Sequence, residues 1–383
     1  MAGFLFSTLG ISQQSVVKMQ PPHQESETDP AETCNDRIRR FWKWFQEVAP
    51  TFYETIEVGD CHTLEAATSE KIDLMFPDFN WAYGPGESNV GHSLTLTGEG
   101  VEHRQLLALH WLSQAPVIDG WTFYAARQPG PEKGYPIEIY GNRIDPKEIW
   151  VPPSVDQDEE CVDLTIWHPS WTQIEKQQQW TIALLFLDAI LGEYGTGWWI
   201  GQIRLENDQL ANSFPLAELR SFIDETSERT GWRKYPPGKG MFVYRINPPE
   251  TKFPRSDLIS LSTAVPDLSM AHLRVEGMLK DPLEGTGADF LFIAIPKAFF
   301  PKGQEVAKRG EVEDAIDAAL KSKASGRCVG GGFGTERGYV DLLIFDGRRS
   351  LTIIIETLSS HNLPEGTSIE YFAKEKSTDR ILL

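Results

Sequence analysis

The order of apolar segments in the last third of the chain constrains the fold more than any other feature. Residues 289–295 form the continuous apolar run of a buried strand, and residues 311–323 place Val312, Ile316 and Leu320 on one face of a helix. Two strands, a helix and a final strand are predicted to follow, at 327–332, 338–345, 350–360 and 367–372. The order β-α-β-β-α-β is that of a ferredoxin-like domain.

Tryptophan and charge divide the chain into two parts. All twelve tryptophans lie between Trp42 and Trp232, and the 151 residues that follow contain none. Residues 1–250 carry 36 acidic and 19 basic residues, a net charge of −17, whereas residues 251–383 carry 19 and 17, a net charge of −2. So acidic a surface repels phosphate backbones, which argues against nucleic-acid binding by residues 1–250.

The length of the chain predicts more than one domain. At 383 residues it exceeds the size at which a single core stops growing. We expect an α+β fold with helices packed on mostly antiparallel sheets. The predicted parts are a disordered polar segment at 1–36, a Trp-rich acidic α+β domain at 37–235, and a ferredoxin-like domain at 236–383 that begins with a linker or extension.

Within the Trp-rich domain, periodicity predicts alternating helices and strands. A helix capped by Asn35 or Asp36 would carry an apolar face made of Ile38, Phe41, Trp42 and Phe45. Further helices are predicted at 63–76, 101–113 and 173–191, and strands at 79–83, 92–97, 120–125, 161–167 and 198–205.

No sequence signal points to a membrane, a secretory leader or a metal. The most apolar stretch, 180–191, is shorter than the roughly 20 residues that a spanning helix needs. The N-terminus lacks a basic region and a cleavage site of the secretory type. Cys34, Cys61, Cys161 and Cys328 show no CxxC spacing, which fits neither a zinc site nor a disulfide scaffold. We expect a cytoplasmic protein with no membrane association, metal or cofactor.

The strongest concentration of candidate catalytic residues is His92, Glu99, His103 and His110. On an ideal helix His103 and His110 are two turns apart, roughly 10.5 Å along the axis, so one metal ion does not readily bind both. The HExxH spacing of zinc proteases is absent. These residues have two interpretations. They form a metal-binding or acid–base site, or the histidines lie on the surface or are hydrogen-bonded in the core.

A second candidate group follows the strand at 161–167. Asp163 and His168 lie near its end, with Ser170 close by, but a catalytic triad requires spatial geometry that spacing does not show. Asp188 lies within an apolar helix and could be a buried carboxylate with a raised pKa, but the favoured interpretation is a residue that faces solvent or caps a neighbouring backbone group.

The glycine-rich run from Gly330 to Gly338 resembles a nucleotide-binding loop only in composition. Such a loop follows a strand and opens a helix, whereas these glycines connect two predicted strands and no Lys-Ser/Thr pair ends the run. A strained hairpin or β-bulge is the favoured interpretation.

Pairs of neighbouring tryptophans suggest aromatic surface. Adjacent or near-adjacent indoles do not all enter one core, so some are expected to be exposed and to bind a partner. The alternative is that they fill the space between the helices and the sheet. The candidate binding residues are Trp42, Trp44, Trp167, Trp171, Trp198 and Trp199.

Four segments resemble an uncharacterised family of bacterial conserved hypothetical proteins. They are residues 41–45 (FWKWF), 84–86 (GPG), 91–100 (GHSLTLTGEG) and 120–124 (GWTFY), and the resemblance runs from about residue 37 to the end. It implies a bacterial, cytoplasmic setting and no assigned activity. The last 100 residues are also similar, in topology only, to small acidic ferredoxin-like regulators that inhibit enzymes.

These features predict a non-catalytic binding or regulatory protein. It would be an immunity-type or enzyme-inhibiting protein whose acidic, Trp-rich surface binds a protein partner, for which a basic protein is a candidate. The alternative is a hydrolase that uses His92, Glu99, His103, Asp163 or His168. A weaker alternative is a carbohydrate-binding module. The sequence does not indicate an oligomeric state.

Overall fold

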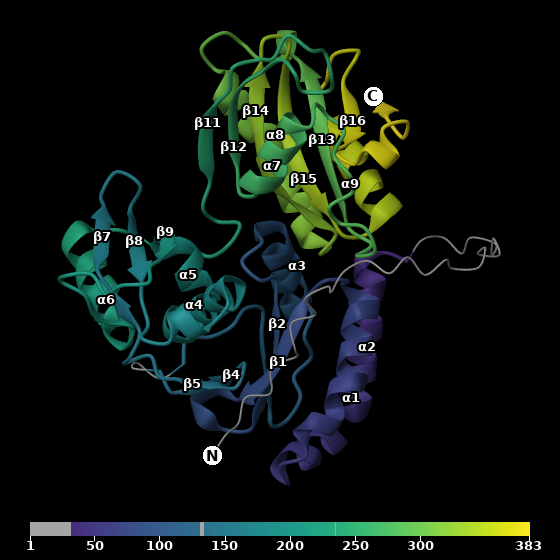
Figure 1. Ribbon diagram of the computed structural model, residues 1–383. Coiled ribbons are helices and arrows are strands. Elements are labelled where there is room, and N and C mark those ends of the chain that lie inside the picture. Colours follow the sequence, from purple (N-terminus) through teal and green to yellow (C-terminus); the bar gives the residue numbers. More distant parts are fainter. Residues whose placement is uncertain (1–31, 131–133, 234) are drawn as a thin grey trace, which may run out of the picture. The chain divides into compact units, whose positions relative to one another are not determined.

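The computed structural model describes residues 32–130, 134–233 and 235–383, and it has an α+β fold (Figure 1). The predicted disordered segment falls almost entirely outside the described residues. The chain forms two compact units. The sheet unit comprises the described residues among 1–83, 113–121 and 240–383, and the middle unit comprises those among 84–112 and 122–239.

The sheet unit begins with a long amphipathic helix, α1 (Cys34–Glu57). Its N-cap is Thr33, whose hydroxyl accepts a hydrogen bond from the Asp36 backbone while the Asp36 carboxylate accepts one from the Thr33 backbone. Ile38 and Phe45 are buried, so the predicted apolar face is confirmed. The helix starts at Cys34, two residues before the predicted boundary at 36, because Thr33 supplies the cap.

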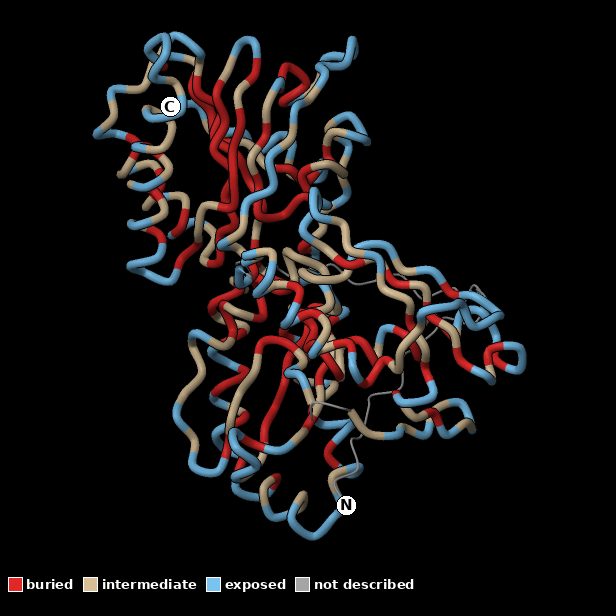
Figure 2. The backbone as a smooth tube through the Cα atoms, turned by 90° about the vertical axis from the view of Figure 1, so that its left-hand side faces the viewer, coloured by how far each residue is buried: buried red, intermediate tan, exposed pale blue. Residues whose placement is uncertain are grey.

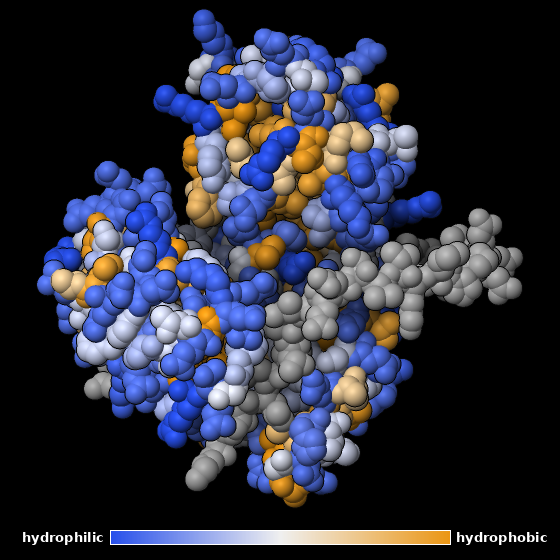
Figure 3. Space-filling view, in the orientation of Figure 1, coloured by the Kyte–Doolittle hydropathy of each residue, from blue (hydrophilic) through white to orange (hydrophobic). Residues whose placement is uncertain are grey.

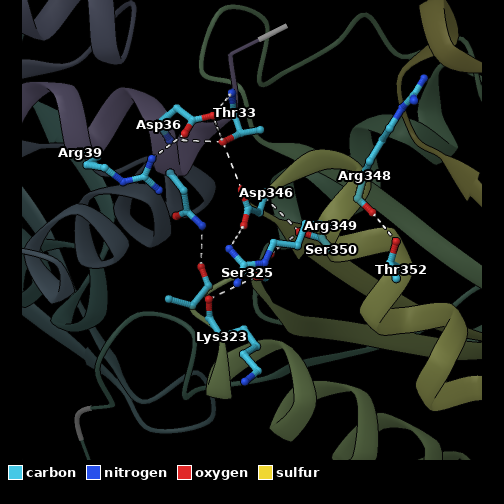
Figure 4. A network of polar contacts seen from close by, with 12 residues as sticks. Thr33, Asp36, Arg39, Lys323, Ser325, Asp346, Arg348, Arg349, Ser350 and Thr352 are labelled. Atoms are coloured by element: carbon cyan, nitrogen blue, oxygen red, sulfur yellow. Dashed lines mark hydrogen bonds and ion pairs between the residues drawn. The ribbon is translucent and has the colours of Figure 1, made fainter. Parts of the chain in front are cut away.

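Residues near the C-terminus hold the start of α1. The backbone N–H groups of Cys34 and Asn35 donate to the carbonyls of Gly287 and Phe345, at 2.9 and 3.1 Å. The Thr33 hydroxyl also donates to the Asp346 carboxylate at 3.3 Å, and Figure 4 shows these two side chains facing each other. The first described helix is therefore part of the unit that the last third of the chain builds.

A seven-stranded antiparallel sheet forms the centre of the sheet unit. Its strand order is β11-β12-β14-β15-β13-β16-β17. In that order the strands are Phe242–Arg245, Leu258–Thr263, Gly326–Gly334, Arg337–Ile344, Asp289–Pro296, Ser368–Tyr371 and Ile381–Leu382. Figure 2 shows that buried residues concentrate along these strands.

Helices cover both faces of this sheet. One face is covered by α8 (Glu305–Ser322) and α9 (Gly347–Ser359). Val312, Ile316 and Ile354 of these helices pack against every second residue of the strands. The opposite face carries Phe292, whose ring lies 5.2 Å from that of Phe372 and 6.3 Å from that of His272 on α7 (Pro266–Arg274). Two hydrophobic layers therefore enclose the strands.

The predicted order β-α-β-β-α-β is found as β13-α8-β14-β15-α9-β16. The ferredoxin-like assignment stays a prediction, because β11, β12 and β17 extend the sheet beyond those four strands. The segment before β13 was expected to be a linker or extension, but it contains β11, β12 and α7. Pairing with β14 draws β12 into the sheet, and β12 in turn pairs with β11.

The remaining elements of the sheet unit lie next to α1 in the sequence. They are the short helix η1 (Cys61–Leu64) and α2 (Glu65–Met75), which confirm the predicted helix, and part of β1 (Asn80–Pro85). Thr68 on α2 shares a 2.7 Å hydrogen bond with Tyr83 on β1. Short helices also follow β13 (η5, Lys297–Phe299) and β16 (η6, Lys374–Lys376).

The middle unit contains a three-stranded sheet packed on helices. Its strands β7 (Pro153–Asp156), β8 (Cys161–Ile166) and β9 (Ile200–Leu205) pair antiparallel and then parallel. Val162, Leu164 and Ile166 of β8 are buried against Ile182 and Phe186 of α4 (Lys176–Leu191). The alternation predicted for residues 161–167 is thereby confirmed.

Smaller elements surround this core. They are η2 (Glu87–Asn89), β2 (His92–Thr97), α3 (Glu102–Ser113), β3 (Trp121–Tyr124), β4 (Ile137–Ile139), β5 (Asn142–Ile144), β6 (Trp150–Val151), η3 (Trp171–Gln173), α5 (Glu193–Trp199), β10 (Phe214–Pro215), η4 (Leu216–Glu218) and α6 (Leu219–Thr230). The elements β1, α3 and β3 each cross a boundary between the two units. No helix in the described part of the chain is long and apolar enough to cross a membrane.

The two units do not coincide with the predicted domains, 37–235 and 236–383. The sheet unit combines segments that come from both predicted domains. The second boundary lies close to the predicted one, between Lys239 and Gly240. Residues 32–83 and 113–121 nevertheless belong with the C-terminal segment, because hydrogen bonds tie the start of α1 to Gly287 and Phe345. Such pairings connect residues about 250 to 310 positions apart and leave no periodic signal in the sequence.

Candidate functional site

The predicted histidine and glutamate candidates lie at separate places in the middle unit. His103 is on α3, where burial and the charge of Arg104 lower its pKa to about 4, so it is neutral at pH 7. His110 is a buried residue of the same helix, and His92 begins β2. Glu99 pairs with Arg127.

Asp163 and His168 also have separate partners. The Asp163 carboxylate accepts a hydrogen bond from the backbone of Gln202 at 2.7 Å, which connects β8 to β9. The buried His168 accepts one from the backbone of Ser170 at 3.1 Å, and burial lowers its pKa. Both side chains therefore stabilise local backbone, and the described contacts do not bring them together.

The expectation that some tryptophans are exposed is wrong. Five are buried and seven are partly buried. Of the six candidates, Trp42 and Trp171 are buried, and Trp44, Trp167, Trp198 and Trp199 are partly buried. Trp198 and Trp199 end α5 and do not begin a strand, because the helix continues to Trp199 and β9 starts at Ile200. Trp199 stacks on Trp232, with 6.3 Å between ring centroids.

The glycine run is part of strand β14. A β-bulge lies between Cys328 and Gly330, which agrees with the interpretation made from the sequence. A Cβ atom on Gly331 would lie 2.3 Å from the carbonyl oxygen of Tyr339, and one on Gly332 equally close to that of Ser260. Glycine is therefore needed for close contact between strands, not for binding phosphate.

A cluster of three carboxylates around one guanidinium lies inside the middle unit. The Arg127 guanidinium contacts Glu99 at 2.5 Å and Asp188 at 3.4 Å. Glu193 is 2% exposed and accepts hydrogen bonds from the hydroxyl of Thr97, the backbone of Gly100 and Arg127, and the side chain of Gln105, at 2.6 to 3.2 Å. This cluster contains Glu99 but none of the other predicted catalytic residues.

Burial changes the acidity of Asp188 in this cluster. Loss of solvent raises its pKa from 3.8 to about 6, against the stabilising effects of a hydrogen bond from Thr196 and the charge of Arg127. The nearby charges of Glu193 and Glu99 raise the pKa further. Asp188 is thus a largely buried carboxylate that titrates near neutrality, and the solvent-facing position that the sequence favoured is wrong.

The sheet unit presents a different kind of site at the edge of its sheet. Directly after β11, the backbone of Ile246 donates to Ile259 at 3.0 Å, which continues the antiparallel ladder with a hydrogen-bonded pair. Because such pairs alternate, the backbone N–H and C=O groups of Val243 and Arg245 point away from β12. As the sheet ends at β11, these groups face outward.

The side chains along this edge are apolar and exposed. Val243 is 76% exposed, Met241 49% and Phe242 43%, and Ile259 of the neighbouring strand is also exposed. Figure 3 shows apolar residues on this part of the surface among hydrophilic ones. The strand is four residues long, and proline pairs precede and follow it in the sequence, at Pro236-Pro237 and Pro248-Pro249.

The chain was compared with protein-family models, curated proteins and solved structures. No protein-family model, curated protein or solved structure matches the chain. The resemblance to a bacterial family therefore stays a prediction. The described residues contain no group of three or more His, Cys, Asp or Glu side chains that would hold a metal ion.

Proposed function

We propose that this protein is a non-catalytic binding protein whose β11 edge pairs with an extended segment of a partner protein. The observation that carries the proposal is the outward direction of the Val243 and Arg245 backbone groups beside exposed apolar side chains. An added strand would form main-chain hydrogen bonds with these groups and bury the apolar side chains. The proposal includes an enzyme as the partner, whose activity the bound protein would regulate or inhibit.

Charge along the chain indicates the chemistry of the partner segment. In the sequence from Gly240 to Pro249, which contains β11, Arg245 is the single charged residue, although the net charge of the chain is −19. Arg245 is exposed on the edge strand itself. The net charge of the whole chain suggested a basic partner, but the positive charge of Arg245 beside exposed apolar side chains favours a short segment that carries acidic and apolar residues.

The test is affinity capture from the host with a matched pair of variants. Val243→Pro removes an outward N–H that β12 does not use and places a ring on the edge, so capture of the partner should fall at least about tenfold. Val243→Thr keeps the N–H and the β-branched shape and should retain most of the capture. Equal recovery by Val243→Pro and the wild type, with unchanged thermal unfolding, would contradict the proposal.

The hydrolase alternative retains one supporting observation, the raised pKa of Asp188 near Glu99. A carboxylic acid with a pKa of about 6 is suited to donate a proton near neutral pH. Hydrolysis of p-nitrophenyl esters that Asp188→Asn abolishes and that the surface variant Glu225→Gln retains would favour this function. Absence of turnover by the wild type would count against it. The carbohydrate-binding alternative relied on exposed tryptophans and loses that support.

A further inference from the structure

A polar pocket of about 370 Å³ lies on the sheet unit, beside the strands β13, β15 and β16. Phe292 of β13 and Tyr339 of β15 line it from the sheet face opposite α8 and α9. Arg255, Arg337 and Arg380 line it as well. The volume falls within the range of small-molecule sites, and an aromatic surface with a few convergent polar groups is typical of them.

The innermost cation of the pocket already has its counter-ion. Arg255 donates to both carboxylate oxygens of Asp341, and its guanidinium lies 5.2 Å from the ring centroids of Phe292 and Tyr339. Its Nε is buried and has no hydrogen-bond partner among the described residues. Arg255 therefore contributes one unused donor but no unbalanced charge.

The acidic residues of the pocket are also engaged. Asp257 accepts hydrogen bonds from the backbone of Glu336 and Arg337, at 2.9 and 3.1 Å, and from the Tyr339 hydroxyl. Glu370 pairs with Arg380 at 3.1 Å. The donors to Asp257 are neutral, so its carboxylate keeps its charge but its oxygens are already occupied, and Glu336, like Glu370, pairs with a cation, Lys252.

Arg337 differs from the other cations in the pocket. Its guanidinium donates to the carbonyl oxygens of Gly366, at 2.8 Å, and Ala294, at 3.5 Å, and to no carboxylate in the described part of the chain. A half-buried guanidinium bound only to neutral acceptors keeps its full charge and several unused donors. The fork of N–H groups matches a carboxylate or a phosphate.

We propose that this pocket binds a small organic anion, whose carboxylate or phosphate group Arg337 and Arg380 hold while Phe292 and Tyr339 contact its carbon skeleton. Arg380 fits the second position because its guanidinium, 44% exposed in its side chain, has donors beyond those used by Glu370 and Ser368. The site is separate from the β11 edge in its residues and in its ligand.

Isothermal titration calorimetry with three probes tests the proposal. Citrate represents carboxylates, glycerol 3-phosphate represents phosphates, and glycerol is the uncharged control. One of the two anions should bind the wild-type protein and glycerol should not. Binding of neither anion overturns the proposal, as does equal binding of glycerol. The anion that binds identifies the oxyanion class.

Variants assign the binding to the pocket. Arg337→Gln keeps the backbone donor to Asp257 and removes the charge, so the anion should bind about 10- to 100-fold more weakly. Arg380→Gln provides a second, more exposed position with the same expectation. Arg39→Gln removes a cation whose side chain is 69% exposed on α1 and should leave binding unchanged. Unchanged affinity in both pocket variants, or an equal loss in Arg39→Gln, overturns the assignment.

Discussion

The Arg255 guanidinium donates to both oxygens of the Asp341 carboxylate, at 2.6 and 3.0 Å, and the two side chains are 2% and 0% exposed. Their attraction offsets the cost of removing both charges from water only while both are present. The stability of the sheet unit is therefore sensitive to the loss of either partner.

Asp341→Leu should lower the free energy of unfolding by about 3–5 kcal/mol, because it leaves Arg255 charged and unpaired inside the unit. The double variant Arg255→Met/Asp341→Leu should be more stable than the single one. Urea unfolding followed by far-UV circular dichroism measures both. As a control, Arg39→Met breaks an exposed pair and should cost about 0–1 kcal/mol. A double variant less stable than Asp341→Leu would contradict this account.

Asp188 should make stability depend on pH in an identifiable window. Its pKa in the folded protein, about 6, exceeds the ordinary value of 3.8, so the folded state binds more protons between these values. The free energy of unfolding therefore falls as pH rises from about 4 to about 6. Asp188→Asn should remove up to about 3 kcal/mol of this change, whereas the exposed Asp224→Asn should not. Superimposable profiles of unfolding free energy against pH for the wild type and Asp188→Asn would contradict the shift.

Two glycine-to-alanine changes should have opposite effects on the sheet unit. In Gly331→Ala the new methyl group would lie 2.3 Å from the Tyr339 carbonyl oxygen, so β14 must shift and the free energy of unfolding should fall by about 1–3 kcal/mol. Gly310, inside α8, has no atom within 4 Å of that position, so Gly310→Ala should stabilise by up to about 1 kcal/mol. Denaturant midpoints measure both. A tolerated Gly331→Ala would show that the strands can separate.

The sequence predicted those elements whose side chains follow a regular period. Val312, Ile316 and Leu320 repeat at helical spacing, and α8 buries all three. Strand β12 was missed because the bulge between Leu258 and Ser260 shifts its alternation of buried residues. Strand β11 was missed because it is only four residues long and prolines flank it.

The candidate sites were harder to predict because their residues are distant in sequence. Glu99 and Glu193, which contribute to one buried cluster, are 94 positions apart (193 minus 99), and neither has a neighbouring motif that distinguishes it from a surface carboxylate. Asp188 carried a local signal, since it interrupts an apolar helix. The outward direction of the Val243 backbone follows from its pairing with β12, which no local pattern encodes.

The hydrogen bond from Thr33 to Asp346 spans 313 positions of the chain. During synthesis, the beginning of α1 leaves the ribosome long before the carbonyl of Phe345 and the carboxylate of Asp346 that anchor it. The sheet unit therefore completes its structure only after residues 345 and 346 have been released, and the apolar face of α1 must stay protected from aggregation until then.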